Sequence, residues 1–120
     1  MFTLGDSFLA GEEVHGKHHL WVIFNEPAQH NGTALFVNVT TFSAIAETTC
    51  VLQPAEHPFI KHSSWIRYAS AKTALISELE ALEAAKLIIR QTTASAALIE
   101  KIRAGAAASP LLPQKFLTLL

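Results

Sequence analysis

The six histidines are the residues of this sequence best suited to chemistry, because imidazole ordinarily titrates near neutral pH. All six lie in the first 62 residues, at positions 15, 18, 19, 30, 57 and 62. Cleavage of RNA needs a base that takes the 2′-hydroxyl proton and an acid that protonates the leaving oxygen, and two histidines supply both without a metal. The candidates for one such site are His19, Thr40, His57, Lys61, His62 and Ser63.

A structural role is the alternative for each of these histidines taken singly. His57 is followed by Pro58 and can pack beside it, and His62 can cap a turn. The catalytic interpretation therefore depends on the fold bringing several of the candidates to one place.

A metal site is a further alternative for the early histidines. His15, His18 and His19 closely follow Glu12 and Glu13, and zinc binds both imidazole and carboxylate. However, His18 and His19 are adjacent, and adjacent residues of a strand point to opposite faces. The sequence also has no H-E-x-x-H pattern and no pair of cysteines. We therefore expect a solvated loop here, and neither a metal nor another cofactor.

The composition predicts one small domain. The chain has 120 residues, half of them hydrophobic, so it can build a core without disulfides. Charged residues make up only 16%, which favours a homodimer that covers further surface. The single cysteine, Cys50, lies in an apolar stretch and is expected to be a buried, inert thiol of a reducing, cytoplasmic compartment. We see no signal peptide and no apolar run long enough to cross a membrane.

The charge is distributed unevenly along the chain. Residues 1–70 contain six acidic and three basic residues, whereas residues 71–120 contain four acidic and six basic ones. The first half is therefore no obvious binder of polyanions at neutral pH unless its histidines are protonated.

Strand patterns occupy the first 70 residues. Residues 19–25 and 33–41 are rich in β-branched and aromatic side chains, and the Asn31-Gly32 turn pair predicts that they form a hairpin. Shorter strands are expected at residues 7–9, 49–52 and 65–68, while prolines keep residues 54–62 irregular. Short strands at this spacing are typical of a small barrel or sandwich, with the aromatic residues in its core.

Helical patterns follow. Ser77 and Glu80 have the spacing of a capping box, and the positions of Leu79, Leu82, Lys86 and Ile89 then recur at helical spacing. Ser95 is expected to cap a second helix with its apolar face formed by Leu98, Ile99 and Ile102. A third, short helix is expected near the C-terminus, after residue 109 or after Pro113. We therefore predict a single α+β domain, with a β-barrel at residues 1–70 and a helical extension packed on it at residues 71–120.

The order of the first 70 residues resembles the MazF/PemK toxins of bacterial toxin–antitoxin pairs. Members begin with a Gly-Asp pair and a short strand, for which Gly5 and Asp6 are the counterparts here. Residues 18–23 resemble the second strand of the family, and residues 36–41 resemble the third, which ends in a pair of hydroxyl residues. Residues 60–66 are similar to a later stretch, in which a polar loop with a serine precedes a hydrophobic strand.

This resemblance implies an SH3-like β-barrel, usually dimeric, that cuts single-stranded RNA without a metal and is silenced by a small antitoxin protein. The active pair of the family is an arginine at the start of the second strand and a threonine at the end of the third, which correspond to His19 and Thr40. Arginine is a permanent, forked cation, whereas histidine can serve as an acid or base. We predict His19, Thr40 and His62 as catalytic residues, with His57, Lys61 and Ser63 binding substrate. The alternative is an inactive SH3-like barrel that binds a peptide or protein.

Overall fold

The computed structural model describes residues 1–12 and 17–120, with the backbone alone for Glu12 and Lys17. Its elements, in chain order, are β1 (Ser7–Glu12), β2 (Lys17–Ile23), the 3₁₀ turn η2 (Pro27–Gln29), β3 (Thr33–Thr41), β4 (Val51–Leu52), β5 (Ser64–Leu75), α1 (Ile76–Ala84), β6 (Ile89–Gln91), α2 (Ala96–Ala108) and the 3₁₀ helix η3 (Gln114–Leu119).

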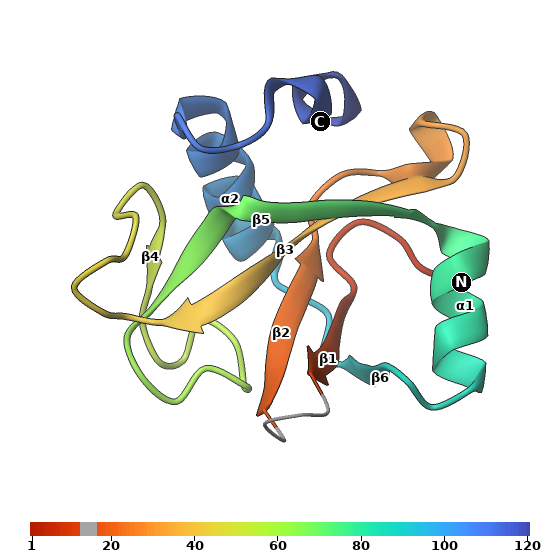
Figure 1. The fold of residues 1–120 in the computed structure, drawn as a ribbon, viewed down its shortest axis with the longest axis horizontal. Coiled ribbons are helices and arrows are strands. Elements are labelled where there is room, and N and C mark those ends of the chain that lie inside the picture. The colour runs from red at the N-terminus through yellow and green to blue at the C-terminus, as the bar shows by residue number, and fades with distance from the viewer. Residues whose placement is uncertain (13–16) are drawn as a thin grey trace.

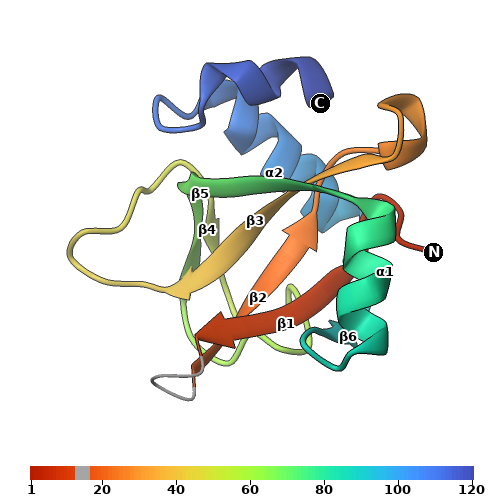
Figure 2. The same ribbon diagram turned by 45° about the vertical axis from the view of Figure 1, so that its right-hand side comes forward.

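The strands form one antiparallel sheet in the order β4-β5-β3-β2-β1-β6. The sheet curls into a half-barrel, with α2 and η3 near one end and α1 at the side (Figure 1). The turned view in Figure 2 shows β1 lying below the long β5 strand and β2 rising toward it. The predicted α+β class and the combination of a small curled sheet with helices are confirmed.

Alternation along the strands divides the buried residues between two hydrophobic clusters. The larger cluster joins Leu20, Val22 and Val37 of the sheet to Ile99 and Ile102 of α2. The smaller cluster lies on the opposite sheet face, where successive side chains of β2 and β3 alternate in direction. It comprises Phe2, Phe8, Trp21, Ile23, Ala34, Phe36, Leu79 and Ile88. The prediction that the strand aromatics are core residues is confirmed.

Short sequence patterns predicted the positions of a turn and a helix start correctly. Asn31 and Gly32 both have positive φ, 56° and 79°, as the predicted hairpin turn requires. The hydroxyl of Ser95 accepts a hydrogen bond from the Leu98 N–H at 3.1 Å and so caps α2 as expected. The capping box was predicted at Ser77 and Glu80, but in the structure it lies two residues earlier in the sequence. Helix α1 begins at Ile76, and the Glu78 carboxylate accepts from the Leu75 N–H at 3.1 Å.

The second half of the chain is less helical than predicted. Strand β5 was expected at residues 65–68 but continues to Leu75, beyond the expected boundary at residue 70. Ile89 was assigned to a helix face and instead begins β6, which pairs with β1. Residues 71–75 of β5 and 89–91 of β6 therefore belong to the sheet, although they lie in the segment that was expected to be the helical extension.

The single cysteine is buried. Cys50 is a free thiol with 2% of its surface exposed, and burial raises its pKa, so the expected inert, buried cysteine is confirmed.

The helices of residues 1–12 and 17–120 include none with the length and hydrophobicity of a membrane-spanning segment.

Candidate active site

One cavity gathers four of the six predicted site residues. It has a volume of about 530 Å³ and lies where the start of β2, the end of β3 and the loop before β5 meet. The residues that line it are His18, His19, Val39, Thr40, Thr41, Phe59, Ile60, Lys61, His62 and Ser64. His19, Thr40, Lys61 and His62, predicted from the sequence to share a site, thus line the same cavity.

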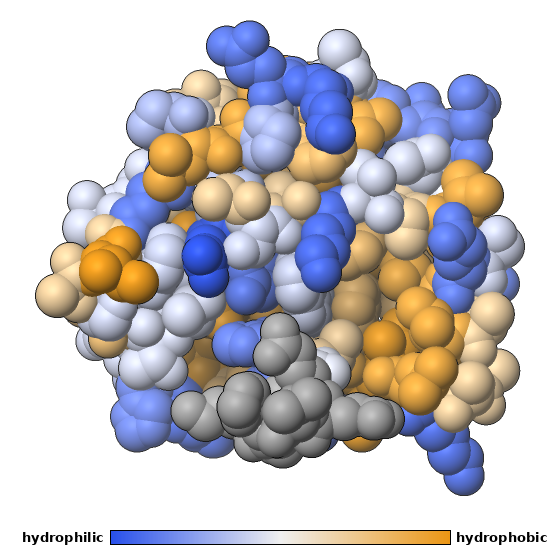
Figure 3. Space-filling model, viewed as in Figure 1, coloured by the Kyte–Doolittle hydropathy of each residue, from blue (hydrophilic) through white to orange (hydrophobic). Residues whose placement is uncertain are grey.

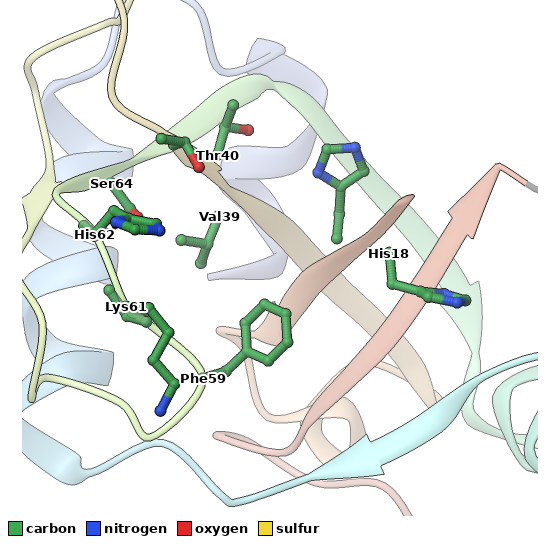
Figure 4. A pocket seen from close by; sticks show the side chains of 10 residues that line it. His18, Val39, Thr40, Phe59, Lys61, His62 and Ser64 are labelled. Atoms are coloured by element: carbon green, nitrogen blue, oxygen red, sulfur yellow. Dashed lines mark hydrogen bonds between the residues drawn. The ribbon is translucent and has the colours of Figure 1, made fainter. Parts of the chain in front are cut away.

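The register between β3 and β5 brings the loop to the strand end. Thr41 lies opposite Ser64, and the Phe42 N–H donates to the Ser63 carbonyl at 2.9 Å. These contacts hold the segment that contains Lys61 and His62 against the end of β3. Figure 4 shows Thr40, Ser64 and His62 close together at one side of the cavity, with Lys61 and Phe59 beside them and His18 across from them.

The Thr40 hydroxyl has no hydrogen-bond partner among the described residues, although its oxygen is shielded from solvent. A buried hydroxyl without a partner costs free energy, which a ligand with a complementary group would recover. By contrast, the Ser64 hydroxyl donates to the His62 carbonyl at 2.8 Å and fixes the loop. Of these two hydroxyls, that of Thr40 is therefore the one left without a partner among the described residues.

The polar groups of the cavity suit an anion. Lys61 and His62 are exposed, and they share the cavity with two further histidines. No aspartate or glutamate is among the described residues that line it. Phe59, with 37% of its surface exposed, adds an aromatic surface at the edge. A phosphate group would meet the Lys61 ammonium group, imidazoles and hydroxyls here, and a planar ring could stack against Phe59.

His57 lies outside this cavity and has a structural environment. Its side chain is 2% exposed, and its Nδ1 accepts from the Phe59 N–H at 3.1 Å. Because Nδ1 accepts, the proton of a neutral ring resides on Nε2, which lies 2.7 Å from the Thr92 carbonyl and 3.2 Å from the Ser7 hydroxyl. His57 thus connects the loop to β1 and to the segment before α2. Its environment is structural, through hydrogen bonds rather than the packing beside Pro58 that was considered for it.

Ser63 is also absent from the cavity lining. Its hydroxyl donates to the Gln53 side chain at 2.9 Å, so it closes the loop between residues 53 and 63. The structure therefore brings neither His57 nor Ser63 to the cavity that contains the other four candidates.

Sequence reasoning missed four polar or aromatic residues of the cavity. They are His18, Thr41, Phe59 and Ser64. Thr41 and Ser64 each adjoin a predicted residue in the sequence, so proximity alone could have suggested them. Phe59 had no local signal, because its position depends on how the irregular loop folds over the sheet.

A metal site gains no further support. Within the described part of the chain, no group of three or more histidine, cysteine, aspartate or glutamate side chains is placed to hold a metal ion. His15 and Glu13, which belonged to the metal interpretation, lie outside the described residues.

In comparisons with known proteins, the sequence matched no protein-family model and no curated protein.

Proposed function

We propose that this protein is a metal-independent endoribonuclease of the MazF/PemK toxin type, acting on single-stranded RNA in the cavity lined by His19, Thr40 and His62. The observation that supports this most is that residues from β2, β3 and the loop before β5 share one cavity without an acidic residue among the described residues that line it. The proposal includes an SH3-like barrel for the curled sheet, a homodimer, a small antitoxin partner and a cytoplasmic location.

The chemistry is an internal transfer at phosphorus. A neutral imidazole removes the 2′-hydroxyl proton, and the 2′-oxygen forms a bond to phosphorus. The bond from phosphorus to the 5′-oxygen breaks, and a protonated imidazole donates a proton to that leaving oxygen. The products are a 2′,3′-cyclic phosphate and a free 5′-hydroxyl. His19 and His62 provide the two imidazoles, one neutral and one protonated.

Charge and hydrogen bonding stabilise the transition state. The Lys61 ammonium group supplies positive charge toward the phosphate oxygens, and the Thr40 hydroxyl donates to one of them. The Thr40 oxygen is shielded from solvent, so its side chain turns toward the phosphate to donate. That turn breaks no hydrogen bond of the hydroxyl with the described residues.

Cleavage of a labelled single-stranded RNA in the presence of EDTA tests the proposal. We expect His19→Ala and His62→Ala each to lower the rate by about 10²-fold or more, because each removes a proton-transfer group. Thr40→Val, which keeps the side-chain shape, should lower it by about 10²-fold through loss of one donor. The rate should fall at both low and high pH, because the mechanism needs one neutral and one protonated imidazole.

His30→Gln is the matched control. His30 directly follows η2, outside the residues that line the cavity, so its replacement should leave the rate unchanged. If the folded protein cuts no single-stranded RNA between about pH 5 and 8, the range in which imidazole titrates, the proposal is wrong. Equal loss of activity in the His30 variant would also contradict it.

A binding module without catalysis is the second candidate. No arginine is among the described residues that line the cavity, whereas the resemblance implies one at the position of His19. The exposed side chains of Phe42 and Phe59 favour contact with a peptide or protein. Binding of an RNA that the protein leaves intact, or of peptides alone, would select this candidate over the nuclease.

A further inference from the structure

A second groove adjoins the histidine cavity. It lies between α1 and the sheet face that carries Trp21, and it has a volume of about 430 Å³, within the range of about 300–1,000 Å³ typical of small-molecule sites. His19 lines both the cavity and the groove. Leu79 and Leu82 of α1 form an apolar wall. Figure 3 shows hydrophobic side chains gathered toward α1 and hydrophilic ones nearer the middle of this face.

Two cations reach the groove because β5 is irregular. Arg67 lies opposite Asn38, and Lys72 lies opposite Phe36, so four residues of β5 separate the two cations where β3 has only one intervening residue. Opposite residues of an antiparallel pair point to the same face, so both cations stand on the side of Asn38. The Lys72 ammonium group lies 5.2 Å from the Trp21 ring centroid.

These cations have no ion pair within the described part of the chain. Among residues 1–11 and 18–120, whose side chains the structure describes, no carboxylate lies within 4.0 Å of Arg67 or Lys72, and no acidic residue lines the groove. Their charge is thus available to an anionic ligand.

The buried amide of Asn38 is a second observation, independent of the cations, that points to a ligand. Its side chain lines the groove and is 6% exposed, yet its Oδ1 has no hydrogen-bond partner among the described residues. The other buried asparagine differs, since Asn25 accepts from the Leu35 N–H at 2.8 Å and donates to the Thr33 carbonyl at 3.0 Å. Asn25 therefore holds the hairpin, whereas the buried amide of Asn38 has no such structural explanation.

The Asn38 amide is free to turn toward a ligand. Its Oδ1 is shielded from solvent, and this atom makes no hydrogen bond with the described residues. Rotation of the amide that exposes the oxygen therefore breaks no such bond, and it lets the group act as acceptor or donor. The groove offers a contact for three features of a nucleotide. The amide can bind the edge of the base, the apolar wall can cover the face of the base, and the two cations can bind the phosphate.

We propose that this groove binds one nucleotide of the RNA strand, next to the nucleotide whose phosphate enters the histidine cavity. The Asn38 amide contacts the base edge, the apolar wall contacts the base face, and Arg67 and Lys72 hold the phosphate. His19 lies between the two sites. This inference rests on the proposed function for its substrate, but binding in the groove can be measured without cleavage.

Asn38→Leu is the deciding variant. Leucine has a similar shape and removes a buried amide without a partner, so thermal stability should be unchanged or higher. Affinity for 5′-AMP and 5′-CMP, followed by chemical-shift changes of the backbone amides of residues 67–72, should fall at least about fivefold. A lower melting temperature would show that the amide holds the fold, and unchanged affinity would show that it contacts no base. Either result overturns the inference.

The cations are tested separately. Arg67→Gln and Lys72→Gln should each weaken nucleotide binding by several-fold and reduce its dependence on salt, because each removes a phosphate contact. Lys115→Gln, in η3 and outside the groove lining, is the matched control and should bind like the parent protein. Equal weakening in all three variants would show a nonspecific effect of net charge and would contradict the inference.

The outcomes separate the two proposals. Nucleotide binding in the groove without RNA cleavage supports this inference and refutes the nuclease. RNA cleavage without any response of residues 67–72 to mononucleotides, up to about 10 mM where even a weak ligand is seen, supports the nuclease and refutes the groove.

Discussion

Burial divides the candidate histidines into two kinds. His62 is exposed and lines the cavity, whereas His57 is 2% exposed and has each ring nitrogen within hydrogen-bonding distance of a neighbouring residue. The same side chain therefore serves different purposes depending on what surrounds it. At the scale of a residue, the number of available partners separates a candidate ligand contact from a structural one.

His57→Ala should lower the free energy of unfolding by about 2 kcal/mol or more, because it leaves a cavity and removes the hydrogen bonds to Phe59 and Thr92. His57→Asn should retain part of the stability, since its Oδ1 can still accept from the Phe59 N–H. Urea denaturation measures both. A His57→Ala protein that is as stable as the parent but binds RNA less well would instead place His57 in the substrate site.

Helix α2 and strand β5 pack closely together where Tyr68 meets Gly105. The Tyr68 hydroxyl donates to the Ile102 carbonyl at 2.7 Å, and burial raises the pKa of Tyr68, which keeps that donor protonated. A Cβ atom added at Gly105 would lie 2.2 Å from the same hydroxyl oxygen. Gly105 lies in the last turn of α2, where close approach to β5 explains why a glycine fits.

Gly105→Ala should lower the free energy of unfolding by about 1–3 kcal/mol or more, because the added methyl group collides with the Tyr68 hydroxyl. Tyr68→Phe alone should cost about 1 kcal/mol through the lost hydrogen bond. In the double variant the collision is reduced, so its cost should be less than the sum of the two. Denaturant unfolding of all four proteins checks this. Simple additivity would show that the two residues do not interact.

At the scale of the molecule, Arg90 joins segments distant in sequence. It lies in β6 and forms ion pairs with Asp6 at 3.1 Å and with Glu83 at 3.0 Å. Its guanidinium group also lies 3.8 Å from the Phe2 ring centroid. The N-terminal segment, α1 and β6 are thereby connected around one side chain, beside the α1 wall of the groove.

These contacts predict a dependence of stability on pH. The hydrogen bonds from Arg90 lower the pKa of Glu83 below its ordinary value of 4.5. The stabilisation is therefore fully present above the ordinary value, and it is lost as pH falls through the lowered pKa. Arg90→Met should lower the melting temperature at pH 7, and this difference should shrink as the pH is taken below about 4. A difference that stays constant with pH would mean that packing on Phe2 dominates.

Part of this fold was decided locally and was predictable. The Asn31-Gly32 turn, the strand at residues 33–41 and the Ser95 cap each depend on neighbouring residues, through positive φ, β propensity and a hydroxyl that accepts a backbone N–H. The association of His19, Thr40, Lys61 and His62 was also predicted, from the chemistry of histidine and from the family resemblance, and all four line one cavity.

The sequence by itself determined the class of fold, the main hairpin and the helix cap, because those signals act within a few residues. Only the tertiary structure decided that residues 89–91 pair with β1, and that His57 faces Thr92. It also decided that Arg67 and Lys72 flank Asn38. These outcomes depend on contacts between distant segments, and the local sequence pattern is compatible with several different pairings of those segments. The groove was invisible in the sequence because the irregularity of β5 that forms it appears only when the strand is paired.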